Sequence, residues 1–167
     1  MASSSDQPTT QQSNVMLSDV IGRDRSINIF ASLTRDVAAV EQRLQEPSQN
    51  STVLAPLNSQ MDNLGRKPWE DARDYENFGA ATAYEGDDGR DRAQRNLRKF
   101  TEAHILPVAN WQEGEKVKSL LEGDKEIWWE NKEGKKVIHP DGIIVDNVAS
   151  KVANGQLWTI RGVRDYS

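Results

Sequence analysis

The sequence predicts an α+β domain with a mainly antiparallel sheet, and three observations lead to this fold class. Apolar residues in the first half recur every three or four positions, as on one face of a helix. In the second half, short β-branched and aromatic runs are separated by glycine-containing turns, which is typical of antiparallel strands. The chain has 167 residues, about the size of one domain. Helices followed by strands within one domain indicate α+β.

We expect the folded part, residues 15–167, to be a single domain. Residues 1–14 are rich in Ser, Gln and Thr and are expected to form a disordered leader, because too few apolar side chains are present to offset the entropy of ordering. They also lack the apolar segment of a signal peptide. Ser26 is suited to cap a helix. The predicted apolar face of that helix consists of Phe30, Leu33, Val37, Val40 and Leu44.

A buried strand and then a long polar segment follow this helix. The apolar run 52–55 predicts the strand, and Asn58 is suited to cap a short helix after it. Residues 65–91 are weakly patterned and are expected to be a long polar insertion or loop, parts of which pack back on the core through aromatic side chains. Ala93, Leu97 and Phe100 then predict a helix that ends before residue 104.

The second half predicts most of the sheet. Strands are expected at 105–108, 126–130, 135–139, 142–148 and 156–160. Val117, Leu120 and Leu121 suggest a short helix that stops at Gly123. Asn154-Gly155 is a strong turn signal, because both residues tolerate positive φ.

Composition excludes several classes of function. The net charge is −5, so nucleic acid, which needs clustered cations, is a poor partner. There is no cysteine, which excludes disulfides and thiolate chemistry. No apolar run approaches the length of a membrane span, so we expect no direct membrane span in this chain.

Three segments, in this order, resemble the signature blocks of the fasciclin family. The stretch 52–61 resembles the first block, a strand of the type T-V-F-A-P followed by a capped helix. The stretch 97–107 resembles the middle segment, a helix that leads into a His-containing strand. The stretch 143–163 resembles the closing block, where an Asn-Gly turn leads into the last strand. The chain is similar to the family from about residue 17 to residue 163, most of all to its fungal single-domain branch.

The resemblance implies a wedge of two mainly antiparallel β-sheets with helices packed at one edge. It also implies a non-enzymatic role in cell adhesion or in binding a matrix or cell-wall partner, without a cofactor, in the secretory pathway, in a vacuole or at the cell surface. The sequence departs from the family at two points. The Asp-Ile pair associated with integrin binding in animal members is absent from the matching stretch 149–152, and Trp158 and Arg161 replace a His and an Asp that many relatives carry.

The residues offer little for catalysis or metal binding. His104 and His139 are the only histidines, and neither lies near a nucleophile motif. We expect His104 to be a hydrogen-bonded structural residue and His139 to lie in a loop at a strand end. The acidic stretch 85–91 lacks the order of an EF-hand loop and is expected to be solvated. We therefore predict no enzyme, no metal and no cofactor.

The Trp128-Trp129 pair is the candidate for partner binding. Neighbours on a strand point to opposite faces, so one tryptophan is expected at the surface, where it would suit a glycan or a protein partner. An alternative is a carrier of a lipid or small molecule, with an apolar pocket near Trp128 and Trp129. Asn50 begins an N-glycosylation sequon, which matters only in the secretory pathway. The identity of the partner does not follow from the sequence.

Overall fold

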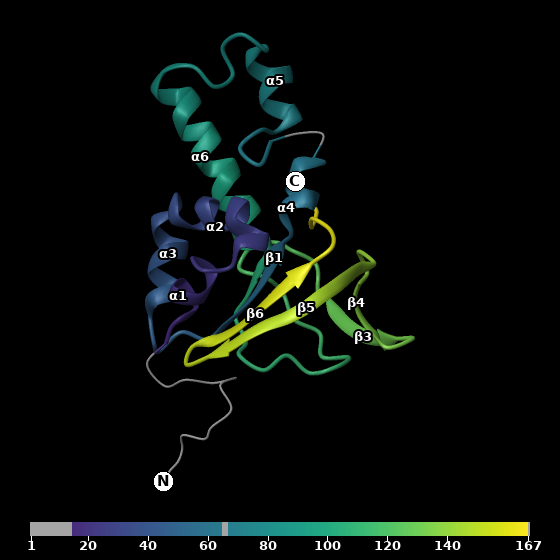
Figure 1. Ribbon diagram of the computed structural model, residues 1–167. Coiled ribbons are helices and arrows are strands. Elements are labelled where there is room, and N and C mark those ends of the chain that lie inside the picture. The colour runs from purple at the N-terminus through teal and green to yellow at the C-terminus, as the bar shows by residue number, and fades with distance from the viewer. Residues whose placement is uncertain (1–14, 65–66, 167) are drawn as a thin grey trace.

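The computed structural model describes residues 15–64 and 67–166, and in them one curled sheet carries helices along one side (Figure 1). The strands are β1 Ser51–Pro56, β2 Ile105–Leu106, β3 Trp128–Lys132, β4 Lys135–His139, β5 Ile143–Val152 and β6 Gly155–Ile160. The helices are α1 Leu17–Ile21, α2 Asn28–Arg35, α3 Ala38–Gln45, α4 Asn58–Asp62, α5 Ala72–Phe78 and α6 Gly86–Ala103, with a 3₁₀ turn at Arg25–Ile27. The predictions for residues 1–14 lie outside the described residues.

The strands are joined in the order β2-β1-β6-β5-β4-β3. Strand β1 runs parallel to β6, and every other neighbouring pair is antiparallel. The α+β class with a mainly antiparallel sheet is therefore confirmed. The two expected sheets are continuous with each other, because the long strand β5 pairs with β4 at its start and with β6 over the rest. Within the part that pairs with β6, the register shifts after Val145 and again after Val148, as at β-bulges.

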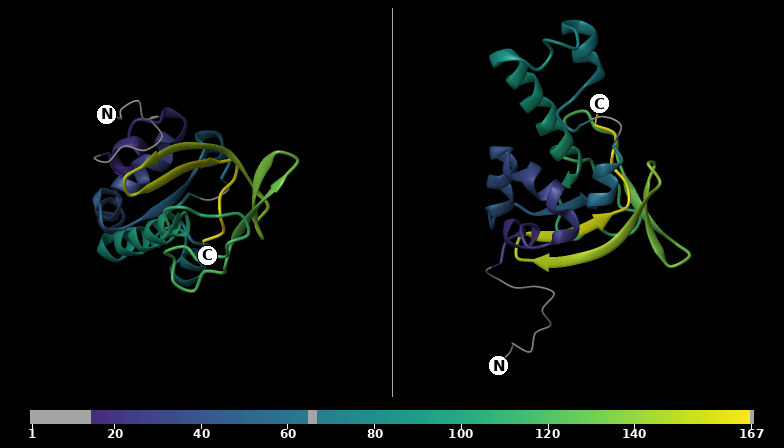
Figure 2. Two further views of the ribbon diagram at one scale, coloured as in Figure 1. Left: turned by 90° about the horizontal axis from the view of Figure 1, so that it is seen from below. Right: turned by 45° about the horizontal axis from the view of Figure 1, so that its top comes forward.

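The curl of the sheet gives β1 and β6 a core on each face. On one face, Val53 and Leu157 pack with the apolar sides of α1, α2, α3 and α6. On the other face, Leu54 and Trp158 pack with residues of β3, β4 and β5. The hairpin of β3 and β4 stands at an angle to β6, away from α1, α2 and α3 (Figure 2). Every residue of β1 and of β6 is buried. The apolar run at 52–55 was predicted as a buried strand, and double burial explains why it does not alternate with polar residues.

The helix predicted from Ser26 to Leu44 is wrong as one continuous element. It is broken between α2 and α3 at Val37, which is extended with φ −112° and ψ 101°. The Nε2 of Gln94 on α6 donates to the carbonyl of Asp36 at the break. Val37 remains buried, so the three-and-four spacing continues across the break and conceals it. Ser26 does not cap this helix: Asp24 caps the preceding 3₁₀ turn by accepting the N–H of Ser26 at 2.9 Å, and α2 begins after Ile27 without a side-chain cap.

The short helix predicted around Val117 and Leu121 is also wrong. Val117 instead exchanges two backbone hydrogen bonds with Ile127, of 2.9 and 2.7 Å, and Leu120 N–H donates to Ile105 O. This segment therefore runs alongside the strands. Its apolar spacing arises from contacts with both cores rather than from a helix.

Residues 67–92 form an arm that extends beyond the rest of the domain (Figure 1). It contains α5 and the first turns of α6, so part of the segment 65–91, predicted as a polar loop, is helical. The aromatic rings of the arm pack mainly on one another. Tyr84 lies edge-on to Trp69 and to Tyr75, with ring centroids 5.0 and 5.4 Å apart.

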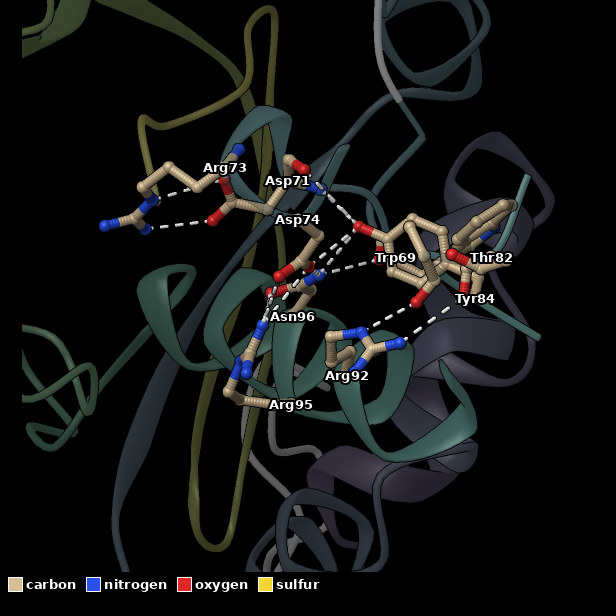
Figure 3. A network of polar contacts seen from close by, with 10 residues as sticks. Trp69, Asp71, Arg73, Asp74, Thr82, Tyr84, Arg92, Arg95 and Asn96 are labelled. Atoms are coloured by element: carbon tan, nitrogen blue, oxygen red, sulfur yellow. Dashed lines mark hydrogen bonds and ion pairs between the residues drawn. The ribbon is translucent and has the colours of Figure 1, made fainter. Parts of the chain in front are cut away.

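A buried carboxylate ties the arm to α6 (Figure 3). Asp74 of α5 accepts hydrogen bonds from Arg95 at 3.0 Å, Asn96 at 2.9 Å and the hydroxyl of Tyr84 at 2.9 Å. Burial alone would raise the pKa of the Asp74 carboxyl, but hydrogen bonds from Asn96, Tyr84 and Arg95 outweigh it and lower that pKa. The charged form of Asp74 therefore holds the two helices together.

Candidate interaction site

The two adjacent tryptophans lie on opposite faces of β3, as strand alternation predicts. Trp129 is 9% exposed and belongs to the core, where its ring lies against Trp158 and its Nε1–H donates to the carbonyl of Trp111 at 3.1 Å. Trp128 is half-buried on the other side of the strand. Of the pair, only Trp128 is placed to contact a partner without unfolding of the core.

Trp128 belongs to a half-buried surface that we call the outer face, made of side chains from β3, β4 and β5. Register places Trp128 beside His139, and Glu130 beside Val137, which in turn neighbours Ile144. All five side chains are partly accessible. The outer face therefore combines an aromatic ring, two aliphatic side chains, an imidazole and a carboxylate.

Three polar groups surround the Trp128 ring. The imidazole of His139 stacks on it, with centroids 5.8 Å apart and planes inclined by 26°. The Nζ of Lys116 lies 5.3 Å from the ring centroid. The indole Nε1–H donates to Glu130 at 3.2 Å. Lys116 is exposed on a flexible side chain, so a partner can displace it and take its place against the ring.

His139 is the last residue of β4 and not a loop residue as expected. Its Nε2 lies 3.6 Å from a carboxylate oxygen of Glu130 and has no hydrogen-bond partner within residues 15–64 and 67–166. Because this nitrogen is buried, the imidazole offers a partner its ring, stacked on Trp128, rather than its Nε2 atom.

Cavities of 410, 370, 250 and 240 Å³ lie in the described part of the chain, and neither Trp128 nor Trp129 lines any of them. The apolar pocket required by the carrier alternative is therefore not found at these four sites. The 240 Å³ cavity is close in sequence, since it lies between the β3–β4 turn and β5, but Lys135, Lys136 and Arg161 give it a charged lining.

His104 is fully buried and both of its ring nitrogens are occupied. Nδ1–H donates to the carbonyl of Phe100 at 2.8 Å, and Nε2 accepts the backbone N–H of Arg164 at 3.0 Å. Burial lowers the pKa of His104 to about 4, so the ring is neutral at physiological pH. The prediction of a hydrogen-bonded structural histidine is confirmed.

Arg164 is a buried cation that the sequence analysis did not identify. Its guanidinium contacts Asp124 at 2.7 Å and Asp141 at 3.0 Å and donates to the carbonyl of Ala103 at 2.8 Å. Burial would raise the pKa of both carboxyls, but their hydrogen bonds and charges lower it. No local pattern signals this cluster, because its members come from distant parts of the sequence. It fixes the chain after β6 to the end of α6.

The remaining predicted positions are placed as follows. Asn50 is exposed at the start of β1, with its carbonyl accepting from Arg43 at 2.8 Å. The acidic stretch 85–91 forms the start of helix α6, where Asp87 pairs with Arg90.

In residues 15–64 and 67–166, no three His, Asp or Glu side chains are grouped as metal ligands would be. Within the same ranges, no helix is both long and apolar enough to cross a bilayer.

Three fungal proteins of similar sequence are described as FAS1 domain-containing proteins. The one from Neurospora crassa is 57% identical over 155 residues, which cover 93% of this chain and 67% of that protein. Those from Aspergillus fumigatus and Emericella nidulans are each 49% identical and match 90% and 88% of this chain. The matched regions span 64% and 60% of these two relatives, so they are longer than the part they share with this chain.

The fold has a relative among solved structures. The FAS1 domain pair of the insect cell adhesion molecule fasciclin I matches with a TM-score of 0.57 over 89% of this chain and 50% of that one, at 12% identity. No family model matches the sequence. The high identity to the Neurospora protein, together with the shared fold, nevertheless decides the assignment: the chain belongs to the fasciclin (FAS1) domain family, alongside fungal members.

Proposed function

We propose that this chain is a non-enzymatic interaction domain that serves cell adhesion or attachment to a matrix or cell wall, and that it binds a protein or glycan partner through the outer face. The family is generally related to adhesion and generally non-enzymatic. The observation that carries the proposal is the half-buried Trp128, which His139 and Lys116 flank and which belongs to a mixed polar and apolar surface.

The chemistry of the outer face suits recognition. An aromatic ring contributes a large contact area at a small cost in side-chain entropy, and tryptophan is enriched where partners bind tightly. Glu130 adds a hydrogen-bond acceptor and His139 a stacked imidazole ring beside it. A sugar ring could replace Lys116 against the indole, and its hydroxyl groups could bond to the carboxylate. A protein side chain could use the same contacts.

The two other candidate functions lack such support. A carrier needs an apolar pocket, and the four cavities described above do not include either tryptophan in their walls. An enzyme needs a titratable group that is free to exchange protons in a cleft. His104 has both ring nitrogens engaged in the core.

We further propose that the domain works in the secretory pathway, in a vacuole or on the cell surface, as fasciclin domains typically do. Asn50 is the candidate site of N-glycosylation in that setting. Its side chain is exposed, whereas Ser51 and Thr52 of the sequon are buried in β1, so modification would have to occur before β1 is folded.

The proposal is tested by screening the protein on glycan and extracellular-protein arrays together with Trp128→Ala. A matched control is Trp69→Ala, since Trp69 is also accessible, 37% exposed, but lies on the arm. We expect a hit that Trp128→Ala abolishes and Trp69→Ala retains, with both variants folded by circular dichroism. Equal binding by all three proteins would exclude the outer face, and the absence of any hit would contradict an adhesive role.

A further inference from the structure

A second candidate site lies in a groove between the two helices of the arm. A cavity of 370 Å³ is lined by Arg73, Asn77 and Phe78 of α5 and by Arg95 and Lys99 of α6. Arg73 and Asn77 are four residues apart, and so are Arg95 and Lys99, so each pair shares one helix face. None of these residues belongs to the outer face, and the groove is therefore independent of the proposed function above.

Although two aspartates also line the groove, the cations dominate what a ligand would meet. The side chains of Asp71 and Asp74 are only 10% and 6% exposed, and they pair with Arg73 and Arg95, which are 62% and 49% exposed. The carboxylates thus lie beneath the guanidinium groups and orient them. Lys99 has no carboxylate partner within residues 15–64 and 67–166, so its charge is available to a ligand.

The arginines retain hydrogen-bonding capacity. In the described part of the chain, Arg95 uses only Nη2 in its contacts with Asp74 and Asn96. Arg73 uses Nε and Nη2 for Asp71, which leaves Nη1. A guanidinium that a buried carboxylate holds in place is preorganised to donate to an oxyanion, with little further entropy to lose.

The groove also offers contacts that a simple ion would not use. Phe78 is 46% exposed, and Arg92 covers one side of its ring with its guanidinium carbon 3.8 Å from the centroid. The exposed remainder of the ring can pack against the apolar face of a sugar, as aromatic rings do. The Asn77 amide is exposed beside it and can both donate to and accept from hydroxyl groups. The volume of 370 Å³ falls within the range of about 300–1,000 Å³ for small-molecule sites.

We propose that this groove binds an anionic sugar, that is, a sugar unit that carries a phosphate, sulfate or carboxylate group. The acidic group lies between Arg73, Arg95 and Lys99, and the sugar ring lies against Phe78 and Asn77. The adjoining cavity of 410 Å³ shares Arg73 and Lys99, but Glu122, Asp124 and Asp165 also line it, so the acidic group is placed in the groove and not in this neighbour.

The test is calorimetric titration of the whole chain with mannose 6-phosphate, a heparin oligosaccharide and a galacturonic acid oligomer, which separate the three acidic groups. Neutral mannose oligomers and inorganic phosphate are the comparators. We expect at least one acidic sugar to bind more tightly than either comparator. Lys99→Gln should weaken that binding about tenfold, because one hydrogen bond to a charged group is lost. Phe78→Leu should weaken binding of the sugar but not of phosphate.

Matched variants keep the result specific. Lys118→Gln removes the same charge from an exposed lysine outside the groove and should bind like the unaltered chain. Trp128→Ala should do the same, since it alters only the outer face. Equal affinity of Lys99→Gln for the acidic sugar would overturn the proposal. Equal affinity for the neutral sugar or for inorganic phosphate would also overturn it, as the site would then not select an acidic sugar.

Discussion

The ring of His104, at the end of α6, accepts the backbone N–H of Arg164 through Nε2, although sixty positions separate the two residues. The bond requires a neutral imidazole, because the other nitrogen already donates to Phe100. The chain that follows β6 is thus attached to the helical layer by a group that protonation would disrupt. Acid is therefore expected to weaken this attachment.

The first prediction concerns this pH dependence. The pKa of His104 is about 4 in the folded state, against 6.5 ordinarily, so between these values the unfolded chain binds the additional proton. The contribution of His104 is fully present above pH 6.5 and is lost as the pH falls toward 4. The free energy of unfolding should decrease by about 3 kcal/mol over this range, as measured by urea denaturation. An NMR titration that gives the His104 imidazole of the unaltered chain a pKa near 6.5 would contradict this prediction. The measurement does not depend on whether a His104→Gln variant folds.

The second prediction concerns the buried cation beside it. Arg164→Met keeps much of the side-chain volume but leaves Asp124 and Asp141 without their shared partner. The free energy of unfolding should therefore fall by about 3–5 kcal/mol. Arg161→Met is the control, since Arg161 is 48% exposed in its pair with Asp146 and should cost less than about 1 kcal/mol. Urea denaturation of the two variants measures both decreases. Equal decreases in the free energy of unfolding would mean that the buried ion pairs contribute no more to stability than the exposed one.

The third prediction concerns the close approach of β6 to β1. A Cβ at Gly155 would lie 1.7 Å from the carbonyl oxygen of Ser51, and the residue has φ +147°. Gly155→Ala must separate the central strands, and a loss on the order of 3 kcal/mol or more is expected. At Gly134, with φ +84° and no atom within 4 Å of the added carbon, alanine should cost only about 1 kcal/mol of backbone strain. Thermal melts compare the two variants, and a lower melting temperature for Gly134→Ala than for Gly155→Ala would refute this account.

The fourth prediction concerns the arm. Asp74→Asn keeps the size of the side chain but removes the charge that Arg95 pairs with, and places an amide where Tyr84 and Asn96 donate. The free energy required for local opening of α5 should therefore fall by about 1–3 kcal/mol. Hydrogen exchange in 72–78 should then accelerate while exchange in β1 and β6 does not. Asp87→Asn, at an exposed pair with Arg90, should leave both unchanged.

The sequence predicts the central part of this fold better than its connections. The run at 52–55 is apolar because both faces of β1 are covered, and the Asn154-Gly155 turn requires a residue without a Cβ next to Ser51. The break at Val37 is not visible, because burial continues through it. Val117 and its neighbours show helical spacing only because they contact two cores, an arrangement that depends on distant strands.

The candidate sites were predictable to a smaller extent. Alternation along β3 shows that Trp128 and Trp129 face opposite ways, but which of them is outside depends on how the sheet curls. The groove on the arm depends on the pairing of Arg95 with Asp74, which is 21 positions away and lies on another helix. Arg164 has partners 23 and 40 positions away. Such pairs are set by tertiary structure, and a single sequence carries no local signal of them.

The parallel pairing of β1 with β6 has a consequence for synthesis on the ribosome. Ser51 is the partner of Gly155, and Pro56 is the partner of Ile160, so one edge of β1 stays without its strand until about a hundred further residues have been translated. During that interval the apolar segment from Val53 to Ala55 is a template for incorrect pairing with another nascent chain. The order of translation therefore makes β6 the element that ends this exposure, and chaperone occupancy on nascent chains should fall once it has left the exit tunnel.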